Sequence, residues 1–476
     1  MSLKKLLCIV FLALSFIGFS QMEMKKSYTL NECIAIAMKN NLELKSSVLS
    51  ANTTKINFQQ SKANILPSLS GSYNIGVNSG RSINPFTNDF VNQELTFSNA
   101  RLNLDVTIFN GFRLINSWKQ ERLNKLASEM EIEEAQQNLI LNVTLAYLQV
   151  LNNRDLLELA KKRLEATNEQ LKRQEDLYKE EVGNPADHAD MIGQKSMDET
   201  NILTAQSALK NAELSLMRLL NLKDDILIDM SDVFIDFENY ELTSDEVFID
   251  ATQNLATFKA RELRVKAAKK GVSVAKASFT PEVSFFGQLN TNYSSVAETF
   301  TETGSSIVET GDFVTISNQN IPVLTNETQF NPERISYQDQ FDNNLNTVVG
   351  VSVSLTLFDG FRAKNNVALE KIRVQESLIE LERTQQDIKN AIEQVHFDMK
   401  TAYKRHQSLL KQVEAFKESY RVNDIRFNNG ASNFIAYITS KNNLDNARTN
   451  LANAKYEYLL RVKILEYYRG NVFESL

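Results

Sequence analysis

The sequence predicts a mainly α-helical protein with a β-barrel part, built from two copies of one unit: helix, strand, strand, long helix, helix. Three observations carry this prediction. The corner motif VTIFNGFR at residues 106–113 returns as LTLFDGFR at 355–362. Four segments of about ten residues alternate apolar and polar side chains, as two-faced strands do. A run of roughly 70 residues with helical periodicity follows each corner motif.

Further landmarks repeat in the same order, which is the signature of an internal duplication. Residues 29–67 align without a gap with residues 243–281, and Gly183 pairs with Gly430. No linker rich in Gly, Pro or Ser separates the copies, so we expect one body. We place the first repeat at 21–222, an equatorial linker at 223–242, the second repeat at 243–468 and a C-terminal tail at 469–476.

The first 20 residues read as a secretory signal peptide, because Lys4 and Lys5 precede an apolar run that ends in small residues. A membrane anchor is the alternative, but the run is shorter than the roughly 20 residues of a spanning helix. Beyond this leader the only cysteine is Cys33, expected to be a packed free thiol. The net charge of -7 argues against a nucleic-acid partner.

Each repeat opens with a capping box, Thr29-x-x-Glu32 or Thr243-x-x-Glu246. Strands are predicted at about 67–78, 100–109, 281–293 and 347–358, each long enough to cross a bilayer when tilted. A soluble sheet covering a core is the commoner alternative, but no other segment has a helical period suited to covering it. The side chains expected to face a barrel lumen are Ser70, Asn74, Asn103, Asp105, Ser284, Gln288, Ser352 and Ser354.

Four strands cannot close a barrel, and unpaired strand edges are too costly in lipid, so the chain is expected to oligomerise. Two copies would give eight strands and a filled interior, whereas three would give twelve strands and a lumen. The loops between the paired strands are polar, and the one at 294–344 is acidic. For that loop a poorly ordered, solvated segment and a cation-attracting vestibule are both open interpretations.

The corner motifs predict strand-to-helix turns, because each glycine permits a sharp change of direction and Asn110 or Asp359 stands at a helix cap. The corner residues are Phe109, Gly111, Phe112 and Arg113 in the first copy and Phe358, Gly360, Phe361 and Arg362 in the second. Gly183 lies 72 residues after Gly111 (183 − 111), which corresponds to a helix of about 100 Å. A heptad seam in the second copy runs from Leu378 to Tyr420.

The chain resembles the TolC-like outer-membrane efflux protein (outer membrane factor) family over nearly its whole length. The features that carry this resemblance are the paired corners, the strand entries at Pro67 and Pro281, and the turns at Gly183 and Gly430. The resemblance implies a homotrimer, with a twelve-stranded barrel in outer-membrane lipid and a long α-helical tunnel in the periplasm. It also implies a periplasmic adaptor (membrane fusion) protein and an inner-membrane RND, ABC or MFS transporter as partners.

The resemblance further implies a passive conduit for substrates exported by the pump, in efflux or type I secretion. A coiled-coil spacer anchored in the outer membrane, holding envelope layers together, is the alternative. Polar side chains on the inner strand faces favour the conduit, because an anchor need not line a lumen.

In this family the channel closes at its periplasmic tip, so the resemblance implies that the gate candidates lie near Gly183 and Gly430. In the family, acidic residues and an arginine follow the second glycine, but here Ser432, Ala436 and Thr439 hold those places. The first tip offers Asp187, His188 and Asp190 instead. An acidic ring moved to the first hairpin and ordinary solvated tip residues are both open interpretations.

The sequence predicts no enzyme, no cofactor and no metal site. His188, His396 and His406 have no partner at a ligand or catalytic spacing. No phosphate-binding glycine loop and no nucleophile motif occurs.

Overall fold

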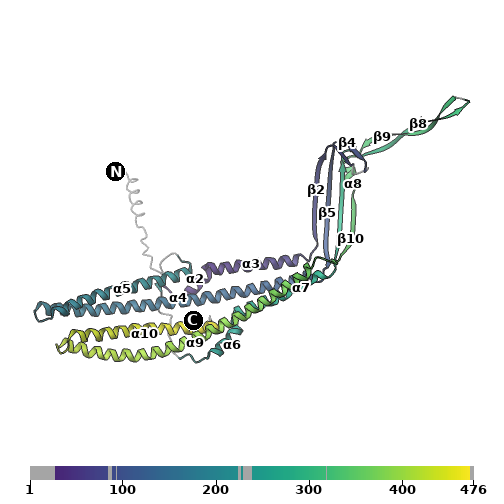
Figure 1. Ribbon diagram of the computed structural model, residues 1–476. Coiled ribbons are helices and arrows are strands. Elements are labelled where there is room, and N and C mark those ends of the chain that lie inside the picture. The colour runs from purple at the N-terminus through teal and green to yellow at the C-terminus, as the bar shows by residue number, and fades with distance from the viewer. Residues whose placement is uncertain are drawn as a thin grey trace, which may run out of the picture. The chain divides into compact units, whose positions relative to one another are not determined.

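A computed structural model describes residues 27–83, 88–92, 94–222, 227–228, 239–317 and 319–471. The predicted signal peptide, most of the predicted linker and residues 472–476 lie outside the described residues. The helices, labelled in Figure 1, are α2 (Leu30–Asn40), α3 (Leu42–Ala63), α4 (Arg113–Lys179), α5 (Pro185–Leu220), α6 (Ser244–Asn254), α7 (Ala256–Lys276), α8 (Tyr337–Asn343), α9 (Arg362–Asn428) and α10 (Phe434–Arg469), with the 3-10 turn η1 (Ala277–Phe279). The strands are β1 (Ser27–Tyr28), β2 (Ser68–Asn78), β3 (Arg81–Ile83), β4 (Phe90–Asn92), β5 (Leu95–Phe109), β6 (Leu227–Ile228), β7 (Glu282–Ser294), β8 (Glu298–Ile316), β9 (Gln319–Arg334) and β10 (Asn346–Ser354).

The chain divides into two compact units, and each sequence repeat contributes to both. Unit 1 comprises residues 1–55, 123–265 and 375–476, and its described part is helical except for the short pair β1 and β6. Unit 2 comprises residues 56–122 and 266–374 and holds the other strands. The repeat boundaries stay a prediction, because the two compact units do not coincide with the two sequence repeats.

The main sheet of unit 2 has the strand order β10-β7-β5-β2, with antiparallel neighbours. Leu104 of β5 lies opposite Leu69 of β2 and Gly287 of β7. The adjacent residue Asn103 lies opposite Ser70 and Gln288. Because side chains alternate along a strand, this register gives the sheet one apolar and one polar face. β5 begins earlier than predicted and β10 ends earlier, at Ser354.

The segment between β7 and β10 is not the poorly ordered loop of one interpretation. It forms the two-stranded ribbon β8–β9 and the short helix α8 (Figure 1). Its Thr, Val, Ile and Phe residues favour strands, and most of them are exposed as expected for a solvated segment. The polar composition therefore indicated exposure correctly but did not indicate irregular structure.

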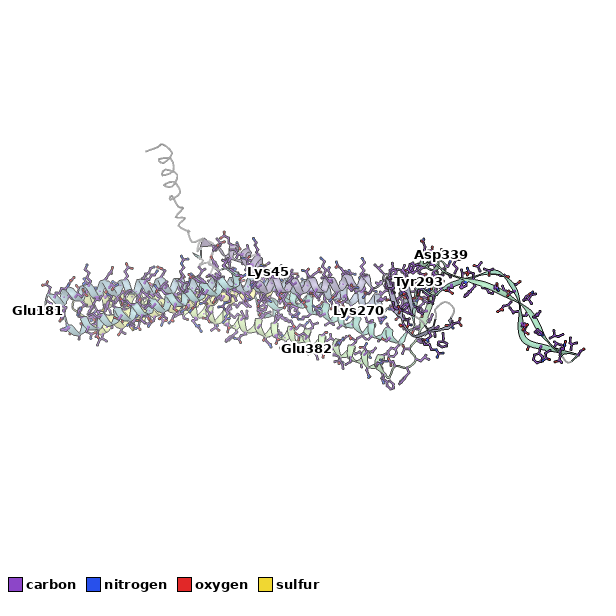
Figure 2. All side chains as sticks on the ribbon, turned by 90° about the horizontal axis from the view of Figure 1, so that it is seen from above. Lys45, Glu181, Lys270, Tyr293, Asp339 and Glu382 are labelled. Atoms are coloured by element: carbon purple, nitrogen blue, oxygen red, sulfur yellow. The ribbon has the colours of Figure 1, made fainter. Side chains whose placement is uncertain are left out.

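The core of unit 1 lies among α2, α4, α5, α6, α9 and α10, with Leu44 of α3 and Phe258 of α7 added at the ends of those helices. The predicted heptad seam of α9 supplies Ile392, Met399 and Ala402, which are almost completely buried. Both predicted capping boxes are confirmed: Thr29 Oγ1 accepts a hydrogen bond from the Glu32 backbone N–H, and Thr243 Oγ1 does so from Glu246. Figure 2 shows the side chains along these helices.

Candidate functional site

The two corner motifs have the same three-dimensional structure. Gly111 and Gly360 have φ values of 64° and 68°. Phe112 and Phe361, which follow them, are also left-handed, at 61° and 65°. In each corner two phenylalanine rings meet edge to face, Phe109 with Phe112 at 5.5 Å and Phe358 with Phe361 at 5.6 Å between centroids. The strain of a left-handed phenylalanine is thus offset twice in the same way.

Each corner also caps the long helix that follows it. The backbone N–H of Leu114 donates to Asn110 Oδ1 at 3.3 Å, and that of Ala363 donates to Asp359 Oδ2 at 2.7 Å. The arginines differ: Arg113 forms an ion pair with Glu282 of β7 at 3.1 Å. Arg362 Nε instead donates to the Asp359 carbonyl at 2.8 Å. The first corner is therefore tied to the sheet and the second to itself.

The register of unit 2 places the eight predicted lumen residues on the same face of the sheet. Ser70, Asn103 and Gln288 lie opposite one another across β2, β5 and β7, and Ser284 lies opposite Ser352. Asn74, Asp105 and Ser354 occupy the same alternate positions of their strands. Their role in lining a lumen stays a prediction.

At the first tip the chain turns between Lys179 and Pro185. Glu181, rather than Gly183, takes the left-handed conformation, at φ 59°. Gly183 is needed for a close approach, since a Cβ there would lie 3.0 Å from the backbone nitrogen of Tyr178. His188 stacks on the Tyr178 ring at 4.9 Å. Burial and the neighbouring Asp190 raise the pKa of the Asp187 carboxyl above its usual value.

At the second tip Gly430 is left-handed, at φ 70°, and Asn433 Oδ1 caps α10 by accepting from the Ala436 N–H at 2.9 Å. Ser432 and Ala436 are half-buried and Thr439 is exposed. Behind the turn lies a cluster missed by the sequence analysis, in which Phe434 and Tyr437 of α10 pack with Leu171 of α4 and Met191 of α5. This cluster joins the two helical hairpins of one chain.

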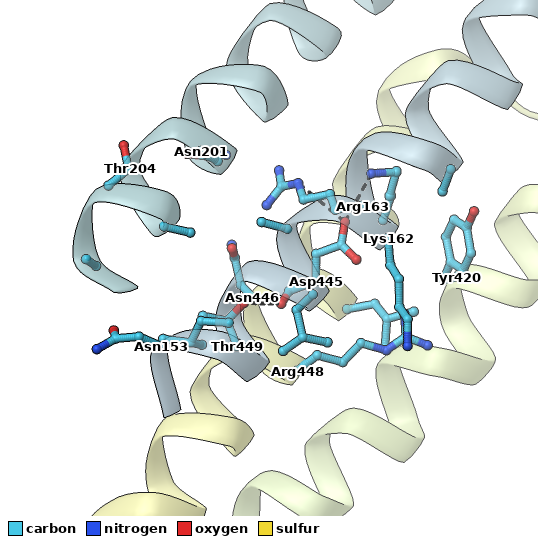
Figure 3. A pocket seen from close by; sticks show the side chains of 18 residues that line it. Asn153, Lys162, Arg163, Asn201, Thr204, Tyr420, Asp445, Asn446, Arg448 and Thr449 are labelled. Carbon is cyan, nitrogen blue, oxygen red and sulfur yellow. Dashed lines mark hydrogen bonds and ion pairs between the residues drawn. The ribbon is translucent and has the colours of Figure 1, made fainter. Parts of the chain in front are cut away.

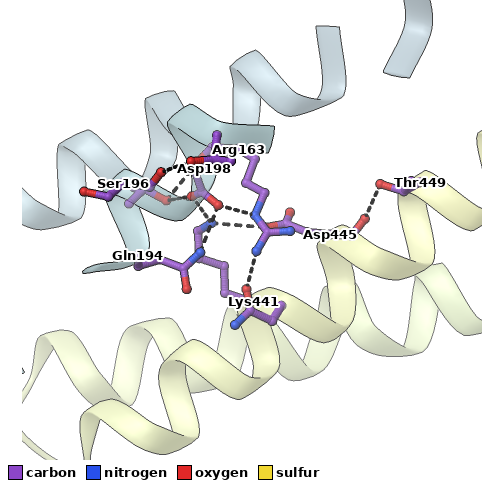
Figure 4. A network of polar contacts seen from close by, with 10 residues as sticks. Arg163, Gln194, Ser196, Asp198, Lys441, Asp445 and Thr449 are labelled. Atoms are coloured by element: carbon purple, nitrogen blue, oxygen red, sulfur yellow. Dashed lines mark hydrogen bonds and ion pairs between the residues drawn. The ribbon is translucent and has the colours of Figure 1, made fainter. Parts of the chain in front are cut away.

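A second feature missed by the sequence analysis is a buried network of charges further along the same helices (Figure 4). Asp198 of α5 is fully buried, and its Oδ1 lies 2.7 Å from Arg163 Nε of α4. Thr167 Oγ1 donates to Asp198 Oδ2 at 2.6 Å, and Gln194 Nε2 donates to Oδ1 at 2.9 Å. The carboxylate therefore has the partners that a buried charge requires.

The network continues into α10, which belongs to the other hairpin. Lys441 Nζ lies 3.1 Å from Asp445 Oδ2 and 3.9 Å from Asp198 Oδ2. Arg163 Nε lies 3.5 Å from Asp445 Oδ2. Two cations thus balance two carboxylates among α4, α5 and α10. A sequence signal existed. Apolar residues recur every three or four positions from Ile202 to Leu216 and from Leu444 to Tyr458, and Asp198 and Lys441 lie four and three residues before these two runs.

A cavity of about 660 Å³ lies beside this network (Figure 3). It is lined by residues of α4, α5, α9 and α10, including Lys162, Arg163, Arg448 and the carboxylate Asp445. The charged residues of its lining are thus mostly cationic, and the remaining polar ones are neutral. Nothing in the geometry of these residues pairs a nucleophile with a base.

Two of the described histidines, His396 and His406, are buried within unit 1. His396 Nε2 lies 3.0 Å from the Leu242 carbonyl, and His406 is buried in the seam of α9. Burial and the nearby Lys455 lower the pKa of His406. Among the described residues no group of three or more His, Cys, Asp or Glu side chains is arranged to hold a metal ion. In the same residues no helix is both long and apolar enough to cross a bilayer.

The chain belongs to the outer membrane efflux protein family (OEP), whose sequence profile matches residues 33–222 and 249–471. It is accordingly an efflux channel of the outer membrane in a Gram-negative envelope, and not an enzyme. The resemblance stated from the paired corners is confirmed.

Among its relatives is the Toxin and drug export protein A of Aggregatibacter actinomycetemcomitans, 21% identical over 91% of this chain and 84% of that protein. Among solved structures, CusC covers 93% of this chain and 92% of its own at 16% identity, with a TM-score of 0.74. VceC of Vibrio cholerae covers 93% and 96% at 14% identity, with a TM-score of 0.72. At these identities the structural likeness concerns the fold, and it confirms the predicted fold class of helices with a strand part.

Proposed function

We propose that three copies of this chain form a continuous channel-tunnel through which exported substrates pass without chemistry. The single observation that carries this proposal is the two-faced sheet with β2 and β10 at its edges. The backbone groups of a strand edge in lipid need hydrogen-bonding partners from another strand. Three sheets of four strands would supply these partners by closing into a barrel with a lumen. The polar face, with Ser70, Asn103 and Gln288 in register, then lines that lumen.

The alternative function, a spacer that holds envelope layers together, does not require such a face. An anchor gains nothing from a polar surface enclosed by its own barrel, whereas a conduit needs one for hydrated substrates. The register places Ser70, Asn103 and Gln288 side by side on one face of the sheet, which supports the conduit over the spacer.

The channel is proposed to receive its substrates from an inner-membrane RND, ABC or MFS transporter through a periplasmic adaptor protein. The tips near Gly183 and Gly430 are the proposed docking and gating end, with Asp187, His188 and Asp190 as gate candidates. The name of the relative from Aggregatibacter makes toxins and drugs the substrate classes to test first.

Planar-bilayer recording tests this function directly. The purified protein should show discrete conductance steps, which should increase when Phe427→Ala and Phe434→Ala remove the aromatic packing behind the second tip. Leu410→Ala, at an exposed position of α9, is the matched control. Absence of steps from the double variant, in protein shown to be folded and inserted, would contradict the proposed continuous channel-tunnel.

A further inference from the structure

The polar face of the main sheet carries a hollow at the end of the sheet next to α8. Its volume is about 520 Å³, and its walls come from β2, β5, β7 and β10 and from Asn344 at the end of α8. Of the ten described residues that line it, six are asparagines and only Arg101 is charged. The hollow therefore combines one positive charge with many amide groups and contains no carboxylate.

The strand register surrounds Arg101 with neutral polar side chains. On the inner strand β5, Arg101 lies opposite Ser72 of β2 and Asn290 of β7. Two residues further along β5, Asn99 lies opposite Asn74, one of the eight predicted lumen residues. Because side chains alternate along a strand, Arg101 and these neighbours share one face of the sheet. The hollow thus opens on the face that is proposed to line the channel.

Arg101 has no charged partner in this part of the molecule. It is the only Lys or Arg in the four described strands of the main sheet. No described residue forms a hydrogen bond or an ion pair with its guanidinium group. Asp105, on the same face of β5, lies four residues away, which is about 13 Å along a strand. Exposed charges are screened within about 8 Å at physiological salt, so Asp105 does not neutralise Arg101.

The acidic helix α8 lies on the other face of the sheet. The Tyr337 hydroxyl of α8 is hydrogen-bonded to the hydroxyls of Tyr73 and Ser98, at 3.2 and 3.3 Å. Tyr73 and Ser98 belong to the apolar alternate set of their strands. Asn344, at the end of α8, donates from Nδ2 to the Asn292 carbonyl at 2.9 Å, which fixes this wall of the hollow.

We infer that this hollow binds an anionic group, a carboxylate or a phosphate, of a substrate in passage. The planar guanidinium of Arg101 presents donors in a fork that matches two oxygens of such a group. The amides of Asn99 and Asn290 can donate to its remaining oxygens. The inference rests on the proposed function, in which three hollows face one lumen, and it names organic anions as a substrate class of that channel.

Block of the channel by citrate, a small organic anion with three carboxylates, tests the inference. Single channels are recorded in planar bilayers from the full chain carrying Phe427→Ala and Phe434→Ala. Citrate should reduce the conductance. Arg101→Gln should weaken this block at least about ten-fold, because hydrogen bonds to charged groups contribute that much to binding. Arg101→Lys keeps the charge but not the fork, and should weaken the block without changing the preference for chloride over potassium.

Arg334→Gln is the matched control, since Arg334 is an exposed arginine of β9 outside the hollow. It should leave the citrate block unchanged. If Arg101→Gln does not insert, Asn290→Asp takes its place, because a carboxylate opposite Arg101 should occupy the guanidinium and weaken the block similarly.

The outcomes separate this inference from the proposed function. A conducting channel that citrate does not block, or blocks equally before and after Arg101→Gln or Asn290→Asp, overturns the anion site and leaves the channel intact. Equal weakening by Arg334→Gln would show that the charge of the whole mouth, and not the hollow, attracts citrate, and would also overturn the site. Absence of conductance from folded, inserted protein overturns the proposed channel itself.

Discussion

At the scale of single residues, the stability of the fold depends on a few positions where the neighbouring atoms leave no room for a larger side chain. The two corner glycines look equivalent in sequence and have nearly equal φ values, yet their surroundings differ. A Cβ at Gly111 would lie 1.9 Å from Thr280 Oγ1, whereas one at Gly360 would meet nothing within 4 Å. The duplication preserved the turn but not its packing.

Gly111→Ala should therefore be more damaging than Gly360→Ala. Gly360→Ala should lose only the free energy needed to hold an alanine in the left-handed conformation, about 1 kcal/mol. Gly111→Ala must in addition displace the Thr280 side chain. Urea titration of the purified protein in detergent measures both. Equal losses of stability would show that φ alone determines the requirement for glycine.

Asp198→Asn should destabilise unit 1 strongly, because it leaves Arg163 and Lys441 buried with one carboxylate instead of two. Removing one partner of a buried pair costs about 3 to 5 kcal/mol. Glu393→Gln is the control, since its pair with Lys389 is half exposed and should contribute less than about 0.5 kcal/mol. Comparable midpoints for the two variants in urea would contradict a structural role for the network.

His406 should make the stability of unit 1 sensitive to acid. Its pKa is lowered in the folded state, so its contribution to stability is complete above the ordinary value of about 6.5 and is lost as the pH falls through the folded pKa. The unfolding temperature should fall between pH 7 and pH 5. His406→Gln should remove the part of this decrease that comes from His406. If the variant has the same pH profile as the unmodified protein, the decrease comes from other groups.

At the scale of elements, adjacent residues of one strand are expected to have opposite environments. Leu104 and Asn103 of β5 belong to the apolar and the polar face of the sheet. The long helices also have a buried and an exposed face, but with a helical period. In α9 the seam residues Ile392 and Met399 are buried, whereas Phe397 is exposed.

Leu104→Arg should impair assembly, because an arginine facing lipid near the middle of a barrel costs about 2 to 4 kcal/mol. Asn103→Arg, one position away, should assemble normally and shift the ion selectivity of the channel toward anions. Folded protein is measured by resistance to protease in isolated membranes, and selectivity by reversal potential. The face assignment fails if the two variants assemble equally poorly.

At the scale of the whole molecule, the sheet edges would determine how copies meet in the proposed trimer. β2 and β10 are the outer strands of the main sheet, and closing the proposed barrel would pair β2 of one subunit with β10 of the next. The cavity beside Asp445 and the cluster around Phe434 lie within unit 1 of one chain, so they do not depend on this closure.

A covalent trimer should therefore form when Ser352→Cys is combined in turn with Ser68→Cys, Ser70→Cys or Ser72→Cys, each in the Cys33→Ala background. One of these pairs should match the register between subunits and link all three copies on a denaturing gel. The single variants are the controls and should stay unlinked. Failure of every pair would contradict closure through these two strands.

The sequence by itself determined what is repeated and periodic: the paired corners, the two faces of the strands, the long helices and the capping boxes. These depend on neighbours within a few residues, or on side-chain alternation that any strand imposes. Only the tertiary structure decided which distant residues meet, such as Arg163, Asp198 and Lys441, or Phe434 with Leu171. It also decided that residues 298–334 form a ribbon. Partners that come from different helices leave no pattern along one segment, because their contact depends on how helices far apart in the chain pack together.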